Sequence, residues 1–385
     1  MEFDFAWVLL GLPIAFGMGW VASRLDIRQM RLENRRAPKA YFRGLNFLLN
    51  DQQDKAIDAF IEAVQNDPDT SELHFALGNL FRRRGEYERA VRVHEHLISR
   101  GDLKAQDRDR AQYALALDFI KAGLLDRAEA ALGKLEGTAF QDQARLALLT
   151  NCERTRNWLQ AASIASQLAS SGQGNFDKRL AHYLCEQALA LQTKDDTQAA
   201  QNLLERAVAT ADHALRPRLA LAQLYMQNQK PEAAYEMLAQ AIEKSPSGLP
   251  LIAPLFASAA IASRRVAAAK EILEAHYKKV TSLDVLEAIV TLDSTIASKG
   301  TSANDWYVQH LEREPSLVAA AKWIAGEKLE HEQFHPQVQR ALDHAVKPLT
   351  CYRCAACGFG ASQHFWQCPG CQAWDSYPAQ RVEEL

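Results

Sequence analysis

The cysteines near the C-terminal end carry the most specific chemical pattern in this sequence. Cys354 and Cys357 form one Cys-x-x-Cys pair, and Cys368 and Cys371 form a second pair after a spacer of ten residues. Two such pairs supply four thiolates, a complete ligand set for one tetrahedral metal ion. Because four thiolates leave no open coordination position, zinc would be structural there, whereas iron could change its oxidation state. We therefore expect one tetrathiolate-bound metal ion, iron or zinc.

Cys351 offers a different first pair, because Cys351, Cys354 and Cys357 are each three residues apart. Gly358 favours the pair of Cys354 and Cys357. In a Cys-x-x-Cys-Gly knuckle a tight turn points backbone N–H groups at the sulfur, and glycine tolerates the left-handed conformation of that turn. Pro369 stiffens the second knuckle in the same way. Cys351 is then an outer residue with no ligand role.

A second metal pattern lies upstream, where residues 331–335 read His-Glu-Gln-Phe-His and match the H-E-x-x-H motif of zinc proteases. In that motif two histidines one helical turn apart hold zinc while the glutamate activates water. Pro336 follows His335 directly and biases it away from the helical geometry that would aim both imidazoles. We interpret the stretch as a charged helix end and keep an HExxH metalloprotease, with His331 and His335 as ligands, as an alternative.

The residues around the four cysteines are unusually aromatic and include Phe359, Phe365, Trp366, Trp374 and Tyr377. A segment this short cannot fold on apolar burial alone, so metal binding should supply much of its folding free energy. Two readings of the aromatic set stay open. The rings form a small core around the metal, or one or two of them dock onto another part of the protein or a partner.

Helical repeats are predicted between this segment and the N-terminal region. Residues 37–280 are rich in Ala and Leu, have helical periodicity, and repeat at the tetratricopeptide interval of about 34 residues. Three units match the pattern best: Gly44, Phe47, Ala56, Phe60, Ala63 and Pro68; Leu77, Gly78, Phe81, Tyr87 and Ala90; Leu221, Ala222, Tyr225, Ala234, Leu238, Ala241 and Pro246. Weaker units contain Leu115, Phe119, Ala128 and Leu132; Leu148, Trp158, Ala161 and Leu168; Ala188, Leu191, Ala200, Leu204 and Ala207; and, as a seventh, Leu255, Ala268, Ile272 and Ala275.

An all-α solenoid of this kind favours protein binding over catalysis, because stacked repeats create an extended groove rather than an enclosed pocket. Residues 281–348 keep a helical composition without the repeat signature, and we expect them to be degenerate repeat or capping helices. The near balance of 44 basic and 47 acidic residues argues against nucleic acid as a partner.

The N-terminal segment predicts a membrane anchor. Residues 5–22 contain no charged side chain and are about long enough to cross a bilayer. Arginines and a lysine follow over residues 24–39, which by the positive-inside rule places the long C-terminal part in the cytoplasm and the N-terminus in the periplasm. A cleaved signal peptide is the alternative, but Glu2 and Asp4 stand where its basic region should be.

Gly11, Ala15 and Gly19 recur at intervals of four in this segment and would lie on one helix face. Small residues so placed let a second transmembrane helix approach, including that of another copy of the chain. Ordinary transmembrane composition is the other explanation, so a homo-oligomer stays open.

The expected order of parts is an anchor over residues 1–22, a basic linker over 23–36, tetratricopeptide repeats over 37–280, capping helices over 281–348 and a metal-binding domain over 349–385. This order, together with the motif Tyr-Arg-Cys-x-x-Cys-Gly-Phe at 352–359 and Cys-Pro-x-Cys-x-x-Trp at 368–374, resembles the lipopolysaccharide assembly protein B family of Gram-negative bacteria. The resemblance covers essentially the whole chain. It implies a rubredoxin-like terminal domain whose ligands correspond to Cys354, Cys357, Cys368 and Cys371.

The resemblance also implies a regulator and not an enzyme. The family is associated with control of lipopolysaccharide biosynthesis at the inner membrane, by promoting degradation of the deacetylase that commits precursors to lipid A. The implied partners are the membrane protease FtsH, that deacetylase, and other inner-membrane lipopolysaccharide assembly proteins. The alternative from a different class is a rubredoxin-like electron-transfer protein that uses the repeats for docking.

Overall fold

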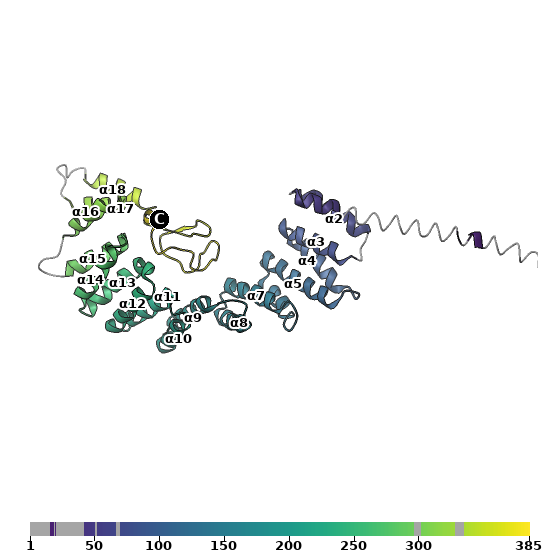
Figure 1. Ribbon diagram of the computed structural model, residues 1–385, viewed down its shortest axis with the longest axis horizontal. Coiled ribbons are helices and arrows are strands. Elements are labelled where there is room, and N and C mark those ends of the chain that lie inside the picture. The colour runs from purple at the N-terminus through teal and green to yellow at the C-terminus, as the bar shows by residue number, and fades with distance from the viewer. Residues whose placement is uncertain are drawn as a thin grey trace, which may run out of the picture. The chain divides into compact units, whose positions relative to one another are not determined.

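The computed structural model describes residues 16–18, 20, 42–50, 52–66, 70–295, 302–327 and 335–385. The chain divides into two compact units, Met1–Gln160 and Ala161–Leu385, called unit 1 and unit 2 below (Figure 1). Unit 1 contains α2 (Gln53–Asn66), α3 (Ser71–Arg83), α4 (Tyr87–Ser99), α5 (Ala105–Ala122), α6 (Leu125–Gly133) and α7 (Gln141–Thr155). α8 (Trp158–Ser170) follows, and most of it belongs to unit 2.

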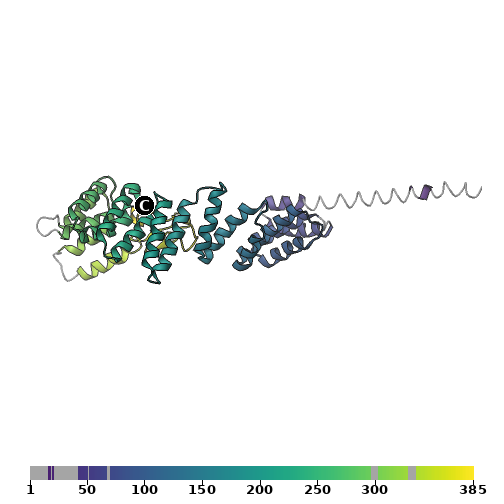
Figure 2. The ribbon, with the colours of Figure 1, turned by 90° about the horizontal axis from the view of Figure 1, so that it is seen from below.

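Unit 2 continues as helices up to residue 346 and ends in a short segment with little regular structure. Successive helices of this unit lie side by side in both ribbon views (Figures 1 and 2). Its helices are α9 (Asp177–Gln192), α10 (Thr197–Thr210), α11 (Leu215–Gln227), α12 (Pro231–Lys244), η1 (Pro246–Gly248), α13 (Leu249–Ala262), α14 (Val266–Tyr277), α15 (Leu283–Thr295), α16 (Ala303–Arg313), α17 (Leu317–Gly326) and α18 (His335–Val346).

A fully buried alanine marks the same position in the second helix of each repeat. Ala56 on α2 is 0% exposed, and so are Ala90, Ala128, Ala161, Ala200, Ala234 and Ala269. These positions recur every 33 to 39 residues along the chain. Small side chains there let neighbouring helices approach closely, which is the packing expected of a tetratricopeptide solenoid. The predicted helical repeat architecture is confirmed in the described region.

In six hairpins from α3 to α14, the turn between the two helices is closed by one residue in the left-handed conformation. Its φ lies between 57° and 81° at Gly85, Gly123, Arg156, Asp195, Gln229 and Arg264. The next N–H donates to the carbonyl five residues back, as from Glu86 to Phe81 at 2.9 Å and from Arg265 to Ala260 at 2.8 Å. This is the Schellman closure of a helix end. Only the first two of these turns use glycine, so the later turns give no glycine signal in the sequence.

The register predicted for the seventh repeat is wrong by one residue. Ala268 and Ala275 are exposed, whereas Ala269, Leu273 and Tyr277 are buried. α14 begins with three consecutive alanines after Val266, and alanines at adjacent positions do not indicate which one faces the core. The left-handed turn at Arg264 fixes where α14 starts and so fixes the observed register.

The hydrophobic core of unit 2 runs past residue 280 without interruption. One cluster of buried side chains joins Phe256 on α13 and Leu273 on α14 to Leu286 on α15 and Val318 on α17. α15 and α17 therefore share the core of the repeats, while the described part of α18 has no buried residue.

The predicted transmembrane segment at residues 5–22 lies outside the described residues, except for 16–18 and 20, which are helical. Across the ranges that the structure describes, no single helix is both long and apolar enough to cross a bilayer. One sharply bent pair, Pro231–Lys244 with Pro246–Ala262, meets the length and composition criteria.

Candidate metal centre

The four cysteines of the two pairs come together at the C-terminal end of unit 2. Their Sγ atoms all lie within 4.8 Å of one another, with 3.8 Å between Cys354 and Cys371 and 3.7 Å between Cys357 and Cys368. Tetrahedral metal–sulfur bonds of about 2.3 Å hold sulfur atoms about 3.8 Å apart. The four cysteines therefore fit one tetrathiolate metal ion, and we call residues 351–377 the metal knot.

Two knuckles with the same backbone hydrogen bonds hold the sulfurs. In the first, Gly358 N–H donates to Cys354 O and Cys354 N–H donates to Phe359 O, each at 2.9 Å. The second repeats this pattern: Gln372 N–H donates to Cys368 O at 2.8 Å, and Cys368 N–H donates to the carbonyl of Ala373 at 2.9 Å. Gly358 has φ +76°, as its place in the motif predicts, and Gln372 takes the same left-handed region at +62°.

A short hairpin carries the first knuckle and positions it against the second. β1 (Tyr352–Arg353) pairs antiparallel with β2 (Gly360–Ala361), with Tyr352 opposite Ala361. An isolated bridge between Gln367 and Trp374 closes the second knuckle. Together these contacts fix both turns at one end of the knot.

Hydrogen bonds to sulfur favour the thiolate form that metals bind. The Ser376 hydroxyl, 3.3 Å from Cys354 Sγ, and the backbone N–H groups of Cys357 and Ala356 lower the pKa of Cys354 to about 6, although burial opposes them. Burial also opposes the shift at Cys368, where the N–H groups of Cys371 and Gly370 nevertheless lower the pKa. The two inner sulfurs therefore form thiolates, the form that metals bind, more readily than a free thiol does.

The structure separates the other cysteines and His335 from this group. Cys351 Sγ lies 3.4 Å from the Lys347 carbonyl and is not among the clustered sulfurs. Cys152 and Cys185 are buried in helices, and burial raises the pKa of Cys185 to about 12, so these thiols are inert. His335 begins α18, and its Nε2 lies 3.1 Å from Ile324 O. His331 is outside the described residues.

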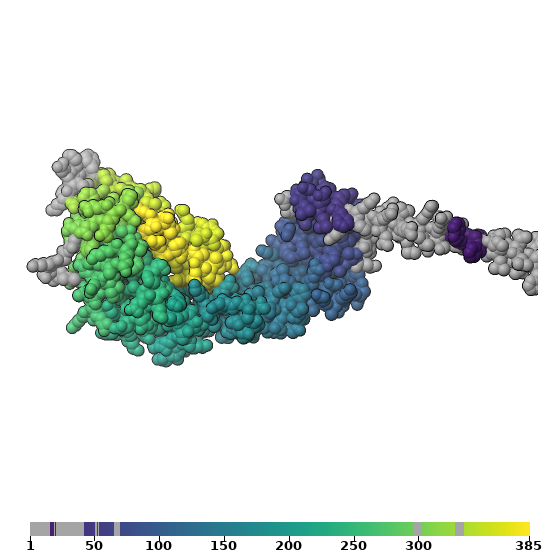
Figure 3. Space-filling model, in the orientation of Figure 1, coloured from purple at the N-terminus to yellow at the C-terminus, as the bar shows by residue number. Residues whose placement is uncertain are grey.

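The aromatic residues of the knot divide between the two roles left open by the sequence. Tyr377 is buried with Tyr352, Cys354 and Cys368, and Phe365 packs against this group. Trp374 instead stacks on His182 of α9, with ring centroids 4.6 Å apart. Trp366 also contacts His182, at 6.3 Å between centroids, so two tryptophans dock on the repeats while other aromatic side chains surround the sulfurs. Figure 3 shows the C-terminal segment in yellow lying against the green helices of unit 2.

A polar network around the buried His182 and Arg216 holds the knot next to this ring contact. His182 Nε2 lies 3.0 Å from an Asp375 carboxylate oxygen, and Arg216 donates to His182 Nδ1 at 3.3 Å and to Glu186 at 2.5 Å. Because arginine can only donate, Nδ1 is the acceptor and the imidazole proton lies on Nε2, facing Asp375. Burial opposes ionisation of Asp375, but the hydrogen bond from His182 and the charges of Lys178 and Arg216 keep its pKa below the usual value.

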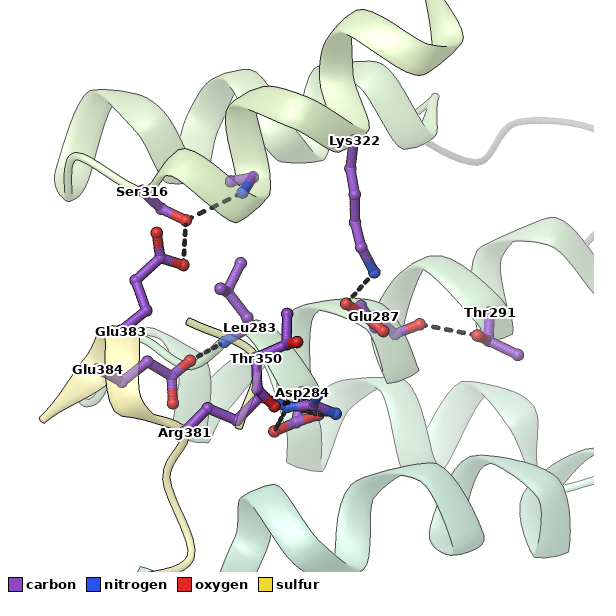
Figure 4. Close-up of polar contacts among 11 residues, drawn as sticks. Leu283, Asp284, Glu287, Thr291, Ser316, Lys322, Thr350, Arg381, Glu383 and Glu384 are labelled. Atoms are coloured by element: carbon purple, nitrogen blue, oxygen red, sulfur yellow. Dashed lines mark hydrogen bonds and ion pairs between the residues drawn. The ribbon is translucent and has the colours of Figure 1, made fainter. Parts of the chain in front are cut away.

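The last residues of the chain fasten the knot to two helix starts (Figure 4). The Glu384 carboxylate accepts the N–H of Leu283 at 2.5 Å, at the start of α15. The Glu383 carboxylate accepts the N–H groups of Leu317 at 2.6 Å and Val318 at 3.2 Å, at the start of α17. Carboxylates at helix N-termini satisfy free N–H groups and oppose the positive end of the dipole.

An ion pair completes this C-terminal clasp, which we define as residues 381–384. Arg381 makes three hydrogen bonds to the buried Asp284 carboxylate, at 2.7, 3.0 and 3.1 Å, and a fourth to Thr350 O at 3.0 Å. The bonds to Asp284 raise the pKa of Arg381, and burial raises the pKa of Glu384. The clasp ties the knot, α15 and α17 into one assembly.

The sequence did not predict the docking residues of the repeats or the clasp. His182 and Asp375 are 193 residues apart in the chain, and no local pattern connects them. Consecutive glutamates near a chain end resemble an ordinary solvated tail. The signal that was available is Trp374-Asp375, which places a ring and a carboxylate directly after the second knuckle.

Comparison with known proteins agrees with both parts of the fold. Residues 352–377 match a family described as a rubredoxin metal binding domain, and residues 73–109 and 191–255 match tetratricopeptide repeat families. The chain is similar to lipopolysaccharide assembly protein B of Escherichia coli (strain K12), with 30% identity over 377 residues, 96% of each chain. It is similar to the protein of that name from Haemophilus influenzae, with 27% identity over 401 residues, again 96% of each chain.

Solved structures of repeat proteins are more distant. The TPR2AB domain of yeast Sti1, in a pHSP90 complex, is 17% identical with a TM-score of 0.34 and covers 73% of this chain and 97% of that chain. Naa15/Naa10 bound to HypK-THB is 13% identical with a TM-score of 0.41, over 82% of this chain and 48% of that chain.

Proposed function

The chain belongs to the lipopolysaccharide assembly protein B family, and from this premise we propose that it is a membrane-anchored adaptor that controls lipopolysaccharide biosynthesis. The relatives' name supports a role in lipopolysaccharide assembly. In the finer proposal the chain promotes proteolysis, by the membrane protease FtsH, of the deacetylase that commits precursors to lipid A. Other inner-membrane assembly proteins are the remaining proposed partners.

The adaptor proposal rests on one observation. The only strong chemical site of the sequence, the cluster of four cysteines, has a structural role. The four clustered sulfurs leave a bound ion no position for substrate, and the knot that holds them is stacked and hydrogen-bonded onto a repeat unit. Repeats of this kind bind other proteins along their surface. We infer that the chain acts by holding partners and has no catalytic residue of its own.

In this proposal Cys354, Cys357, Cys368 and Cys371 are the metal ligands, and the ion contributes folding free energy to the knot. The docked knot fixes the form of unit 2, and through it part of a partner-binding surface. A chelated knot would release Trp374 from α9, and the clasp would then be the remaining link to α15 and α17.

Membrane attachment supplies the second half of the proposal. A single span at residues 5–22, with the N-terminus in the periplasm and the bulk of the chain in the cytoplasm, would confine the repeats to the plane of the protease. Tethering raises the effective concentration of a captured enzyme at the protease without any new chemistry. Small residues at 11, 15 and 19 support pairing of this span with another.

A crosslinked pull-down from membranes tests the proposal. The full chain and a chain lacking residues 1–36 are compared, with the half-life of the deacetylase measured in the same cells. We expect the full chain to capture both the deacetylase and FtsH and to shorten the half-life. The shortened chain should capture the deacetylase and leave its half-life long. Capture of neither protein by the full chain would contradict the adaptor role.

Electron transfer is the second candidate, because Cys357 and Cys371 are exposed and would present one edge of an iron site to solvent. A rubredoxin-like carrier would be purified red, with one reversible iron couple. Purified protein that contains zinc, or iron whose oxidation state does not change reversibly, would favour the adaptor role over electron transfer.

A further inference from the structure

A cavity of about 410 Å³ lies where the metal knot meets the repeats of unit 2. α9, the start of α11, and the start of α13 with η1 form its helical wall, and residues 364–380 form the opposite wall. A cavity of this size can bury a small organic molecule. Neither the metal site nor the docking network fills it.

The charges that line the cavity favour an anion. Lys178 and Arg216 face it, and Asp375 is the carboxylate on its lining, already engaged with His182. Glu186, which balances Arg216, does not line the cavity. Within the described residues Lys178 makes no hydrogen bond or ion pair, so its ammonium group is available to a ligand.

Neutral donors point to the same class of ligand. The side chains of His213 and Ser247 line the cavity and have no hydrogen-bond partner in the part of the chain that the structure describes. The starts of α11 and α13 also line it, and neither has a side-chain cap or an acidic residue in its first turn. At α13 the Leu249 N–H already donates to Pro246 O and Pro250 has no N–H, so the helix N–H donors are those at the start of α11. Ammonium, guanidinium, hydroxyl and helix N–H groups are together the donors that bind phosphate oxygens.

We propose that this cavity binds the phosphate group of a small phosphomonoester, with Lys178 as its principal counter-ion. A phosphate alone would fill only part of the volume. Trp366 and Leu251 supply apolar surface for the rest of the molecule. A soluble phosphate ester and a phosphate-bearing lipid headgroup share this chemistry. The site is separate from the adaptor role, and its ligand would bind beside the Trp374 contact.

Titration calorimetry on the full metal-loaded chain in neutral detergent tests the proposal, with glucose 6-phosphate as the probe. Glucose and glucuronate are the comparators. Glucose is the same sugar without the phosphate, and glucuronate carries a carboxylate in place of the phosphate ester. We expect glucose 6-phosphate to bind at least about tenfold more tightly than either comparator, and binding to weaken as salt rises. Equal binding of glucuronate, or no binding of the phosphate ester, would overturn the phosphate assignment.

A matched pair of variants, Lys178→Gln and Lys194→Gln, tests where the ligand binds. Lys178 lines the cavity, whereas Lys194 is an exposed lysine of the turn after α9 and does not line it. Lys178→Gln should weaken glucose 6-phosphate binding about tenfold, whereas Lys194→Gln should change it less than twofold. Both variants should keep their metal, which excludes unfolding of the knot. Equal affinities in the two variants would place the ligand elsewhere.

A competition experiment distinguishes a soluble phosphate ester from a lipid headgroup as the ligand. Glycerol 3-phosphate and a short-chain phosphatidic acid are each titrated against bound glucose 6-phosphate. Stronger competition by phosphatidic acid would identify a lipid headgroup as the ligand, and stronger competition by glycerol 3-phosphate a soluble ester. Competition by neither would contradict a general phosphomonoester site. Neither the deacetylase nor FtsH is present, so failure here leaves the proposed adaptor function intact.

Discussion

At the residue scale, each knuckle places one sulfur inside the knot and one at its surface. Cys354 and Cys368 are each 1% exposed, whereas Cys357 and Cys371 are exposed. Cys354 Sγ is hydrogen-bonded with the Ser376 hydroxyl, and backbone N–H groups contact both inner sulfurs, so the protein would hold this pair in place together with a metal. Loss of an inner sulfur should therefore cost both the ion and the local fold.

Cys354→Ser and Cys351→Ser form a matched pair that tests the ligand assignment. Cys354→Ser should lose the ion, with an affinity at least about a hundredfold lower, because three thiolates remain and an inner hydrogen-bond acceptor is altered. Cys351→Ser should keep one equivalent of metal, since its Sγ contacts only a backbone carbonyl. Elemental analysis of the purified chains gives the answer. Metal loss from Cys351→Ser would show that the ligand set is wrong.

Asp375→Asn tests the docking network through its pH dependence. The folded-state pKa of Asp375 is depressed, so its contribution is fully present above the unfolded pKa of about 3.9 and is lost only as pH falls through the folded value. The difference in unfolding free energy between wild type and Asp375→Asn should then stay constant from about pH 5 to pH 8. Urea unfolding of the metal-loaded chains measures it. A difference that shrinks well above pH 5 would contradict a carboxylate that the docking network holds ionised.

Local spacing made the cluster of four cysteines predictable, whereas the residues that hold the knot on the repeats were not predictable. Two Cys-x-x-Cys pairs and Gly358 define both knuckles within twenty residues of sequence. His182 and Arg216 belong to different helices and look like ordinary polar helix residues until the fold brings Asp375 to them. Long-range polar pairs of this kind have no periodicity that a single sequence could reveal.

At the element scale, the hairpins of unit 1 depend on small residues where two helices cross. A Cβ atom on Gly78 of α3 would lie 2.6 Å from the His94 ring of α4. That ring cannot move aside easily, because it is fully buried and its Nδ1 lies 2.5 Å from Asp118, which also pairs with Arg82 at 2.9 Å. Glycine at this repeat position is therefore a packing requirement.

Gly78→Ala and Gly133→Ala separate packing from backbone flexibility. Gly78→Ala should destabilise unit 1 by about 1–3 kcal/mol through overpacking. Gly133 ends α6 with nothing within 4 Å of its Cβ position, so Gly133→Ala should be neutral or should stabilise by up to about 1 kcal/mol. Hydrogen exchange of α3 and α4 in both variants reports the packing effect, and exchange of α6 reports the effect at Gly133. Equal exchange rates in the two variants would contradict the close contact with His94.

From the contacts of the clasp we predict that its two glutamates stabilise the starts of α15 and α17. Glu383→Gln should weaken the hydrogen bonds at the start of α17, and Glu384→Gln those at the start of α15. Each variant should lose about 0.5–2 kcal/mol of stability, the usual cost of losing a helix cap. Glu312→Gln, at an exposed position of α16, is the control and should change neither helix start. Hydrogen exchange resolved by segment distinguishes the variants. Unchanged protection of both helix starts would mean that the clasp does not stabilise them.

The turns of the repeats carry a sequence signal only where they contain glycine. Glycine occupies the left-handed position of two turns, at Gly85 and Gly123. Four other turns place a different residue in the same left-handed conformation: Arg156, Asp195, Gln229 and Arg264. The hydrophobic pattern of α14 is diluted by alanine, which explains the one-residue error in its register. Backbone hydrogen bonding, which composition does not encode, determines these turns.

At the scale of the whole molecule, the chain combines two repeat units with a metal knot that belongs to the second. The knot meets unit 2 through the stack of Trp374 on His182, the polar network around Asp375, and the clasp at two helix starts. These contacts link metal binding to the order of α9, α15 and α17. In the adaptor proposal, the site that first suggests reaction chemistry serves to maintain a binding surface.

The half-life of the lipid A pathway deacetylase in cells tests this claim most directly, with wild type, Cys368→Ser and Cys351→Ser compared at equal protein levels. If the metal-bound knot maintains the surface that captures partners, the half-life should be short with wild type and Cys351→Ser and several-fold longer with Cys368→Ser. A short half-life with metal-free Cys368→Ser would contradict the account.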